Sequence, residues 1–339
     1  MRRALALALA GVVAFAMPRA EAAGPTAREW LERMTESLAT RDYDGLFIHT
    51  AGSQSETMRI VHRVEGGRSV ERLVSLDGSG REIVRTPGEV HLYMPDRRVV
   101  LVEPRSDDGS LLKALPAPGP RLDALYNLDL RKGHRLLGRE VRVLDIRPRD
   151  DYRYGYRLWL DHETAMPLRS EVLDGSGTTV EAIHFTRLDV DEAIDPKDLQ
   201  PAVDTTGFQW VRAGRRAESG VAGPPVAAWL PRKMPPGFRL VVSRSQPVPG
   251  SPIPMQHLIF SDGFASVSVF IEPAPEKGPA PSESTTVGSA NAFSMQLRGH
   301  VVTAVGEVPA ATVRDIATSL APVEPELPRA DTPPGPVER

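Results

Sequence analysis

The 339-residue chain contains no cysteine, which excludes disulfides, thiolate nucleophiles and cysteine-ligated metal sites. It also lacks the HExxH motif of metalloproteases, the GxSxG motif of serine hydrolases and the Walker loop of P-loop NTPases. The formal net charge is -3, so the chain lacks the overall basic character that nucleic-acid binding normally requires. These absences argue against the common hydrolase classes and against a nucleic-acid partner.

Long hydrophobic runs are absent beyond the N-terminus, where residues 4–17 form an apolar stretch shorter than the roughly 20 residues of a membrane span. Arg2 and Arg3 precede this stretch, and Ala20-Glu21-Ala22 follows it as a cleavage site. The sequence therefore predicts a Sec-type cleavable signal peptide over residues 1–23. Because no cysteine follows, lipoprotein anchoring is not expected, and we expect a soluble exported protein, located in the periplasm of a Gram-negative cell.

The eight histidines are scattered, and none forms a helical pair at the spacing of metal ligands. Residues 77–80 and 174–177 are both Asp-Gly-Ser-Gly, but each lies between two predicted strands rather than before a helix. Hairpin turns are therefore favoured over phosphate loops. We predict no catalytic residue, no metal and no cofactor, and an enzyme is the least favoured hypothesis.

Residues 147–161, RPRDDYRYGYRLWLD, form the central strand of the prediction. Every second position from Tyr152 to Leu160 is aromatic or aliphatic, and the other register holds Arg153, Gly155, Arg157 and Trp159. This alternation indicates a strand of an antiparallel sheet that covers one face. Neighbouring strands are expected at 141–146, 168–173 and 178–185.

The rest of the first half resembles a meander of short strands behind one helix. Residues 26–40 predict a helix with a capping box at Thr26 and Glu29. Six strands are expected at 46–50, 58–64, 69–76, 82–85, 90–94 and 99–103, and two short helices at 110–115 and 121–126. The pattern is that of an α+β protein whose N-terminal domain, residues 24–211, is a large open, unclosed antiparallel β-barrel with helices.

The second half predicts a linker over residues 212–225 and a smaller C-terminal domain over residues 226–320. Strands at 238–243, 255–260, 264–272, 292–297 and 301–308 precede a helix that begins after Pro309. The turn Ser261-Asp262-Gly263 joins two of these strands. An antiparallel sheet backed by one helix is sufficient for a core. Residues 321–339 are rich in proline and glutamate and are expected to be disordered.

Apolar strand residues belong to a core by default, but a curled, unclosed sheet can also hold a lipid chain. About a dozen buried methylenes would supply on the order of 10 kcal/mol before ordering costs, against roughly 0.2–1 kcal/mol for one exposed ion pair. The side chains predicted to bind lipid are Phe47, Tyr93, Leu112, Leu115, Leu125, Tyr154, Tyr156 and Leu158.

Arginines crowd the central hairpin and the linker. Most are expected to lie on a solvated sheet face, paired with Glu140, Asp145, Asp150 and Asp151. The functional alternative is a rim for an anionic head group or an acidic peptide, because guanidinium groups match phosphates and carboxylates. The residues chosen for that role are Arg149, Arg153, Arg157, Arg212, Arg215 and Arg216.

Several long stretches, in order, resemble the MucB/RseB family of periplasmic regulators of the envelope-stress sigma factor. They are MRIVHRVEGG at 58–67, ERLVSLDG at 71–78, LLGREVRVLDIRPRDDYRYGYRLWLD at 136–161, FSDGFASVSVFIEP at 260–273 and VVTAVGEVPAATVRDIA at 301–317. The resemblance implies an N-terminal domain like that of periplasmic lipoprotein carriers and a smaller C-terminal α/β domain. It implies no catalytic motif that could be transferred residue by residue.

The function that the resemblance implies is negative regulation. Family members bind the periplasmic domain of a MucA/RseA-like anti-sigma factor, shield it from site-1 proteolysis, and are released by lipid or lipopolysaccharide. We expect the small domain and the linker to hold the anti-sigma factor and the hollow to hold an acyl chain. The alternative is a periplasmic lipid or lipoprotein carrier, for which the second domain would be unnecessary. A homo-oligomer is possible.

Overall fold

The computed structural model describes residues 24–105, 112, 119, 121–212, 229–246, 254–274 and 281–323. The described helices are α1 (Ala27–Thr40), α2 (Leu122–Leu125) and α3 (Ala310–Ser319), with the 3-10 turns η1 (Pro95–Arg97) and η2 (Pro196–Leu199). The predicted signal peptide, Leu115, Arg215 and Arg216 lie outside the described residues, as do most of the predicted linker and tail. No helix within the described ranges is both long and apolar enough to cross a membrane.

The N-terminal domain is built on one twelve-stranded sheet. Its strands are β1 (Tyr43–Ala51), β2 (Gln54–Glu65), β3 (Arg68–Ser75), β4 (Glu82–Arg85), β5 (Glu89–Met94), β6 (Val99–Pro104), β7 (Tyr126–Lys132), β8 (Val141–Pro148), β9 (Gly155–Asp161), β10 (Pro167–Leu173), β11 (Thr179–Val190) and β12 (Gln209–Arg212). Their spatial order is β12-β6-β5-β4-β3-β2-β1-β11-β10-β9-β8-β7.

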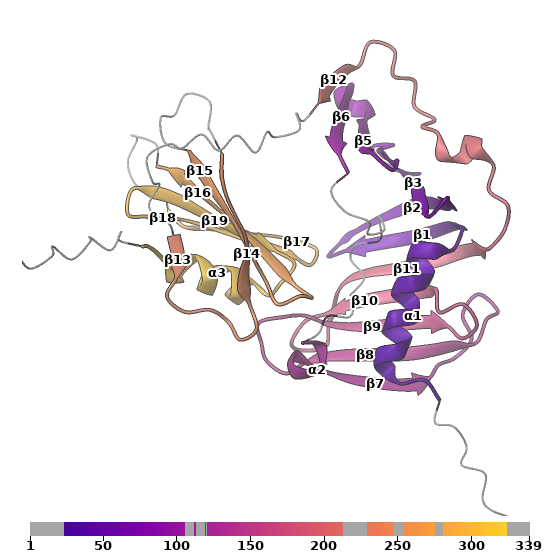
Figure 1. Ribbon diagram of the computed structural model, residues 1–339, viewed down its shortest axis with the longest axis horizontal. Helices are drawn as coiled ribbons and strands as arrows, with labels where there is room; N and C mark the ends of the chain where they lie inside the picture. Colours follow the sequence, from indigo (N-terminus) through magenta and orange to yellow (C-terminus); the bar gives the residue numbers. More distant parts are fainter. Residues whose placement is uncertain are drawn as a thin grey trace, which may run out of the picture.

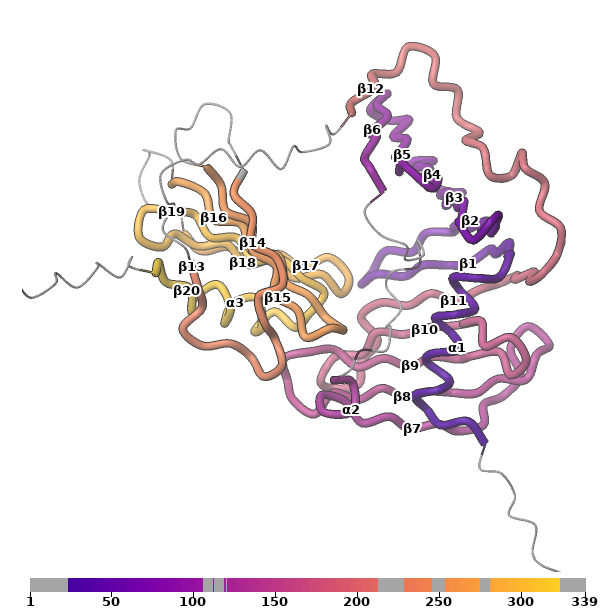
Figure 2. Tube along the Cα trace, viewed as in Figure 1, coloured from indigo at the N-terminus to yellow at the C-terminus, as the bar shows by residue number. Residues whose placement is uncertain are grey.

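The sheet curls but does not close. All neighbouring strands are antiparallel except β12 and β6, and the two edge strands, β12 and β7, are not paired with each other. The ribbon and tube views show the strands from β7 to β1 side by side behind α1, with β2 to β6 turning away (Figures 1 and 2). The predicted α+β class with a large unclosed antiparallel half-barrel is confirmed.

Helix α1 covers one face of this sheet. Thr26 and Glu29 form the predicted capping box, in which the Thr26 hydroxyl accepts from the Glu29 amide and the Glu29 carboxylate accepts from the Thr26 amide. The buried side of the helix carries Trp30, Leu31 and Met34. These side chains share one hydrophobic cluster with residues of the strands, so burial of this face holds the helix on the sheet.

The C-terminal domain is a second antiparallel sheet with one helix. It contains β13 (Trp229–Pro231), β14 (Arg239–Gln246), β15 (Met255–Ser261), β16 (Ser266–Pro273), β17 (Glu283–Val287), β18 (Ala290–Leu297), β19 (His300–Gly306) and β20 (Leu320–Pro322). The six-stranded sheet has the order β14-β15-β16-β19-β18-β17, and β13 pairs with β20. The predicted helix after Pro309 is α3, and its Val313, Ile316 and Ala317 are buried in the core of this domain.

The structure departs from the sequence prediction at several strand boundaries. The central strand begins at Gly155 rather than Tyr152, and Arg153 is therefore not part of an outward-facing register. The predicted helix at 121–126 ends at Leu125, because Tyr126 starts β7. Strands β7, β12, β13, β17 and β20 were not predicted. Of the predicted helix at 110–115, the structure describes Leu112 alone.

Candidate functional site between the two domains

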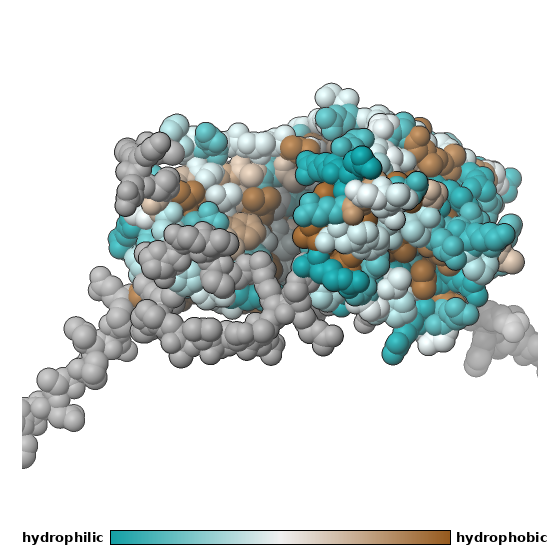
Figure 3. Space-filling view, turned by 90° about the horizontal axis from the view of Figure 1, so that it is seen from above, coloured by the Kyte–Doolittle hydropathy of each residue, from teal (hydrophilic) through white to brown (hydrophobic). Residues whose placement is uncertain are grey.

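The β15–β16 turn of the C-terminal domain docks onto the N-terminal domain. Asp262 Oδ1 accepts from the amides of Phe264 and Ala265, at 2.7 Å each, and Ser261 Oγ accepts from the Gly263 amide at 3.0 Å. These local bonds fix the turn that the sequence predicts, and they leave its tip to present Phe264. Figure 3 shows the face on which a recess separates the two domains, with hydrophobic residues along its sides.

Phe264 packs against two tyrosines of the other domain. Its ring centroid lies 4.7 Å from that of Tyr126 and 5.4 Å from that of Tyr156. Both distances fall in the range of favourable tilted and edge-to-face aromatic pairs. Phe264 is thereby joined to the hydrophobic cluster of the N-terminal domain, although it belongs to the C-terminal one. Burial raises the pKa of both tyrosine hydroxyls well above the ordinary value, so they remain neutral.

Arg153 is enclosed at the same contact, with a side chain that is 0% exposed. Its guanidinium carbon lies 5.8 Å from the Tyr126 ring centroid and 5.3 Å from that of Phe238, so aromatic rings of both domains contact it. Nη2 donates to the Pro236 carbonyl at 2.5 Å. Nε lies 3.4 Å from Asp150 Oδ1 and 3.4 Å from Asp262 Oδ2. A fully buried cation thus lies between two carboxylates, one from each domain.

The approach of the chain to Arg153 requires glycine at position 237. Gly237 has φ +85°, and a Cβ added there would lie 2.8 Å from Leu125 Cδ2 of α2. Both the backbone conformation and the available space exclude a larger residue. The segment between β13 and β14 can therefore pass close to α2, which Figure 2 shows, and bring Pro236 and Phe238 onto Arg153.

A second polar contact lies beside the aromatic one. Asn291 is 4% exposed, and its Nδ2 donates to the Tyr154 hydroxyl at 2.9 Å and to the Val308 carbonyl at 2.8 Å. The Thr312 hydroxyl of α3 donates to the Tyr152 carbonyl at 2.9 Å. Both residues are buried, and their hydrogen bonds to Tyr154 and Tyr152 cross the domain boundary. Separating the domains would leave these groups bonded to water or unpaired.

A third contact joins the turn before β18 to the first residues of β11. Ser289 Oγ donates to Glu181 Oε2, and Glu181 Oε1 lies 2.8 Å from His49 Nε2. Burial acts to raise the pKa of Glu181, but the hydrogen bonds from His49 and Ser289 together hold it below the ordinary value. The hydrogen bond with Glu181 raises the pKa of His49. The pair is therefore an imidazolium and a carboxylate at mildly acidic pH.

The His49–Glu181 pair should contribute most to the free energy of unfolding within a limited range of pH. The raised pKa of His49 contributes stability that is present below its ordinary value of 6.5 and is lost as pH rises through the folded-state pKa. The lowered pKa of Glu181 contributes stability that is present above 4.5 and is lost as pH falls through the folded-state pKa. Between pH 6 and 8 the free energy of unfolding should therefore fall by on the order of 1 kcal/mol through this pair.

Urea unfolding of wild type and His49→Gln at pH 6 and pH 8 measures this effect. The substitution should remove the pH-dependent difference while His134→Gln, at an exposed histidine, should retain it. An equal loss of stability in wild type and His49→Gln between the two pH values would contradict the assignment.

The side chains predicted to bind lipid are mostly in the core. Phe47, Leu112, Leu125, Tyr154, Tyr156 and Leu158 belong to the N-terminal hydrophobic cluster and are at most 9% exposed. Tyr93 lies apart from them, in a small cluster with Val84, Val100 and Val102. The structure thus brings six of the eight together, and a lipid chain that reached them would have to separate side chains that pack against one another.

The predicted arginines have different surroundings. Arg157 pairs with buried Asp145 at 2.5 Å, and Arg212 pairs with exposed Glu89 at 3.0 Å. Arg149 is exposed and donates to the Tyr126 carbonyl at 3.4 Å. Among the described members of the set, Arg153 lies at the domain contact, where its burial excludes the solvated face that most of the arginines were expected to occupy.

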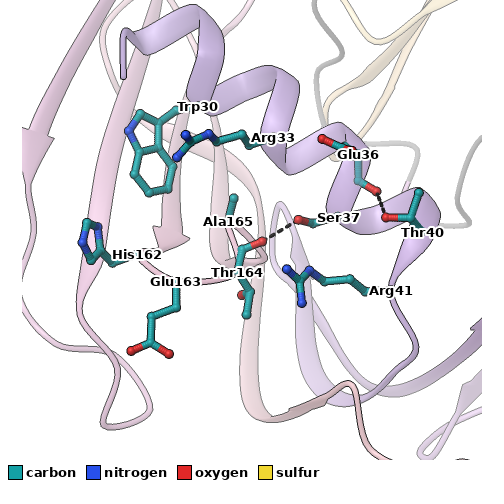
Figure 4. A pocket seen from close by; sticks show the side chains of 10 residues that line it. All are labelled: Trp30, Arg33, Glu36, Ser37, Thr40, Arg41, His162, Glu163, Thr164 and Ala165. Carbon is teal, nitrogen blue, oxygen red and sulfur yellow. Dashed lines mark hydrogen bonds between the residues drawn. The ribbon is translucent and has the colours of Figure 1, made fainter. Parts of the chain in front are cut away.

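A cavity of about 310 Å³ lies between α1 and the turn after β9, lined by residues that include Trp30, Arg33, Arg41, His162 and Thr164 (Figure 4). Trp30 and His162 stack at 5.9 Å, Arg33 lies 5.6 Å from the Trp30 ring centroid, and Ser37 Oγ donates to the Thr164 carbonyl. Arg41 is paired with Asp191. These contacts hold α1 on the sheet. Within the described ranges no group of acidic or histidine side chains is arranged to hold a metal ion.

Comparison with known proteins shows two matching family models in succession. Residues 26–203 match the MucB/RseB N-terminal domain and residues 224–321 match the MucB/RseB C-terminal domain. The chain is 34% identical over 332 residues to the Pseudomonas aeruginosa sigma factor AlgU regulatory protein MucB, covering 95% of this chain and 98% of that one. It is 26% identical over 312 residues to the Escherichia coli K12 sigma-E factor regulatory protein RseB, covering 88% and 91%.

Solved structures show the same similarity in three dimensions. The crystal structure of MucB in complex with MucA(peri) has 31% sequence identity and a TM-score of 0.69, covering 88% of this chain and 100% of that one. The crystal structure of MucB has 31% sequence identity and a TM-score of 0.59, covering 88% of this chain and 98% of that one.

Proposed function

The chain belongs to the MucB/RseB family, and on that premise we propose that it is a periplasmic negative regulator that binds the periplasmic region of a membrane anti-sigma factor. The observation that carries the proposal is the succession of both family domains across one chain, together with the 31% identical structure of MucB bound to MucA(peri). Titration calorimetry with the periplasmic segment of an anti-sigma factor from the same genome tests it. Absence of binding to the full-length mature protein would overturn it.

Binding would control the sigma factor by protecting its inhibitor. A site-1 protease must take its substrate as an accessible extended segment, and a segment held against a folded domain is not accessible. The purified protein should therefore slow site-1 cleavage of the anti-sigma segment in proportion to the fraction bound. Cleavage at an unchanged rate under saturating binding would remove the shielding role and leave the binding role intact.

Strand β14 is our candidate for the anti-sigma contact in the C-terminal domain. It is an edge of the six-stranded sheet, so one side of its backbone is unpaired within the described sheet. Leu240 and Val241 on this strand are 38% and 49% exposed. An extended peptide can add to such an edge through backbone hydrogen bonds and apolar side-chain contacts.

Substitution on this strand gives a specific prediction. Val241→Asp should weaken binding of the anti-sigma segment by about tenfold, because it replaces an apolar contact by a charge at the strand edge. Val287→Asp, at a 65% exposed valine on the opposite edge strand, is the matched control and should bind as wild type does. Titration calorimetry measures both, and equal affinities of the two variants would exclude β14 as the contact.

Release by lipid is the second part of the proposal. A lipid that binds the N-terminal domain would lower affinity for the anti-sigma factor, and linkage requires the peptide to lower affinity for the lipid by the same factor. Support comes from the open sheet and from the group of apolar side chains around Tyr154 and Tyr156. Titrating the anti-sigma segment with and without lipid tests this part, and equal affinities would remove it.

The carrier alternative differs in what the second domain contributes. The hydrogen-bonded contacts of Asn291, Thr312 and Ser289 tie the two domains together, which a carrier acting through its N-terminal hollow alone would not need. The regulator is therefore favoured, and catalysis has no part in it. Lipid delivery to the outer membrane that persisted after deletion of the C-terminal domain would favour the carrier.

A further inference from the structure

Arg153 is held in an incomplete hydrogen-bonding environment. Of its side-chain nitrogens, Nε and Nη1 are buried and have no hydrogen-bond acceptor in the described structure. A buried guanidinium is stabilised by acceptors that match its planar set of donors, and burial without them is costly. Nε and Nη1 are therefore two buried donors that an anion could satisfy, although Nε already lies 3.4 Å from the Asp150 and Asp262 carboxylates.

Asp262 lies where such an anion would bind, but its carboxylate forms no hydrogen bond with Arg153. Its Oδ1 accepts from the two amides of its own turn, whereas its buried Oδ2 accepts no hydrogen bond from the residues that the structure describes. Oδ2 lies 3.4 Å from Arg153 Nε, which is longer than the roughly 2.7–2.9 Å of a good charge-assisted hydrogen bond. With Oδ1 bonded within the turn and Oδ2 at 3.4 Å, this carboxylate makes an ion pair with Arg153 but no short hydrogen bond.

Phe264 occupies the apolar part of the same site. Two positions after Asp262, its half-buried ring fills the space against Tyr126 and Tyr156. The Tyr126 hydroxyl is buried and also has no hydrogen-bond partner in the described structure. Tyr126 and Tyr156 belong to the N-terminal hydrophobic cluster, which also contains Leu125 and Leu158. The turn thus places its carboxylate beside Arg153 and its aromatic ring against the tyrosines of the N-terminal domain.

We propose that the surface covered by this turn is a binding site for an anionic amphiphile, a phosphate or carboxylate that carries an alkyl chain. The anion replaces the Asp262 carboxylate on Arg153, and the chain replaces the Phe264 ring against Tyr126 and Tyr156. Ligand and turn exclude each other, so binding undocks the C-terminal domain. The inference rests on the proposed release by lipid and identifies the place and the means by which lipid would act.

The turn acts as a tethered competitor of the ligand. Because the turn is part of the same chain, its effective concentration at the site is high. A free ligand binds only those molecules in which the site is uncovered, so its apparent affinity is the intrinsic affinity multiplied by the uncovered fraction. Removing the Phe264 ring should therefore increase ligand affinity, whereas removing an ordinary pocket residue would decrease it. This difference in sign separates the proposal from a site that Phe264 merely lines.

Dodecyl phosphate below its micelle concentration is the probe, with dodecanol and inorganic phosphate as the chain-only and anion-only arms. Titration calorimetry on the full-length mature protein gives the affinities. Because the chain has no cysteine, spin labels at Lys132→Cys and Ser284→Cys, both exposed and one in each domain, report domain separation without background labelling. The variants are Phe264→Ala, Arg153→Gln and the matched control Phe270→Ala, on strand β16 of the same hairpin.

We expect dodecyl phosphate to bind and to lengthen the label distance, and Phe264→Ala to bind it about tenfold more tightly than wild type. Phe270→Ala should bind as wild type does. Arg153→Gln should lose about tenfold in affinity for dodecyl phosphate and little for dodecanol. Inorganic phosphate should not change the label distance.

Unchanged or weaker binding by Phe264→Ala would overturn the proposal, as would equal affinity of wild type and Arg153→Gln for dodecyl phosphate. Release of the anti-sigma segment by lipid in either of those cases would show that the proposed regulation operates through another site. Binding of the anti-sigma segment is measured in the same samples. Loss of that binding would contradict the proposed function, whereas loss of amphiphile binding alone would contradict only the amphiphile site.

Discussion

Replacing Arg85 with leucine should lower the free energy of unfolding of the N-terminal domain by about 3–5 kcal/mol. Arg85 on β4 lies directly opposite Glu71 on β3, with Nη1 2.9 Å from Oε2, and the two side chains are 2% and 0% exposed. Removing the guanidinium takes away a counter-charge that lies 2.9 Å from a fully buried carboxylate, and breaking a buried ion pair from one side is strongly destabilising. Urea unfolding followed by circular dichroism measures the loss.

Two comparisons decide whether this loss reflects the buried charge. Arg63→Leu removes an arginine of a 3.2 Å pair whose Glu65 partner is 74% exposed, and it should cost only about 0.2–1 kcal/mol. The double substitution Glu71→Leu, Arg85→Leu removes both charges and should recover most of the lost stability, because an apolar pair of similar volume carries no desolvation penalty. A double variant as unstable as Arg85→Leu would show that packing of the arginine, rather than charge, is responsible.

The sequence predicted those elements whose stabilising contacts lie between residues close together in the chain. The capping box of α1 depends on residues three positions apart, and the strand alternation correctly placed Tyr156, Leu158 and Leu160 together on one covered face of a strand. The turn at Asp262 and Gly263 was also predicted, because its hydrogen bonds lie within five residues. Each of these predictions needed only neighbouring residues and a periodicity.

Arg153 was named as a candidate binding residue, but its predicted environment was wrong, because the side chain is buried. The prediction carried the strand back to Tyr152, which put Arg153 in the outward register beside Arg157. Its actual surroundings come from residues 236–238 and 262, far along the chain, and no local pattern indicates them. The same holds for β12, whose parallel pairing with β6 joins segments about 110 positions apart.

Phe264 was missed as a contact residue, although the sequence contains a signal. Turn residues are generally small or polar, so a large aromatic residue directly after Asp-Gly is unusual. It indicates that another part of the protein, or a partner, packs against the hairpin tip. The sequence alone does not identify the cover. Tyr126 and Tyr156, which provide it, were predicted as a helix end and a lipid-facing strand residue.

Reversing the charge of Asp262 should separate the two domains. In Asp262→Lys a second cation would face Arg153 in a site where both side chains are 0% exposed, and like charges in such a site cost several kcal/mol. Because each 1.4 kcal/mol is a factor of ten, the equilibrium between docked and undocked domains should shift by about 100-fold or more. Small-angle X-ray scattering should show a larger radius of gyration, and the label pair at Lys132 and Ser284 a longer and broader distance distribution.

Asp315→Lys is the matched control, because it makes the same charge reversal at an exposed position of α3 in the same domain. It should scatter as wild type does. Circular dichroism distinguishes undocking from unfolding, since Asp262→Lys loses the cap of one turn but keeps the buried cores of both domains. A compact Asp262→Lys protein with the wild-type label distance would mean that the contacts of Asn291, Thr312 and Ser289 hold the domains together without the Arg153 site, and docking would then be too stable for one amphiphile to reverse.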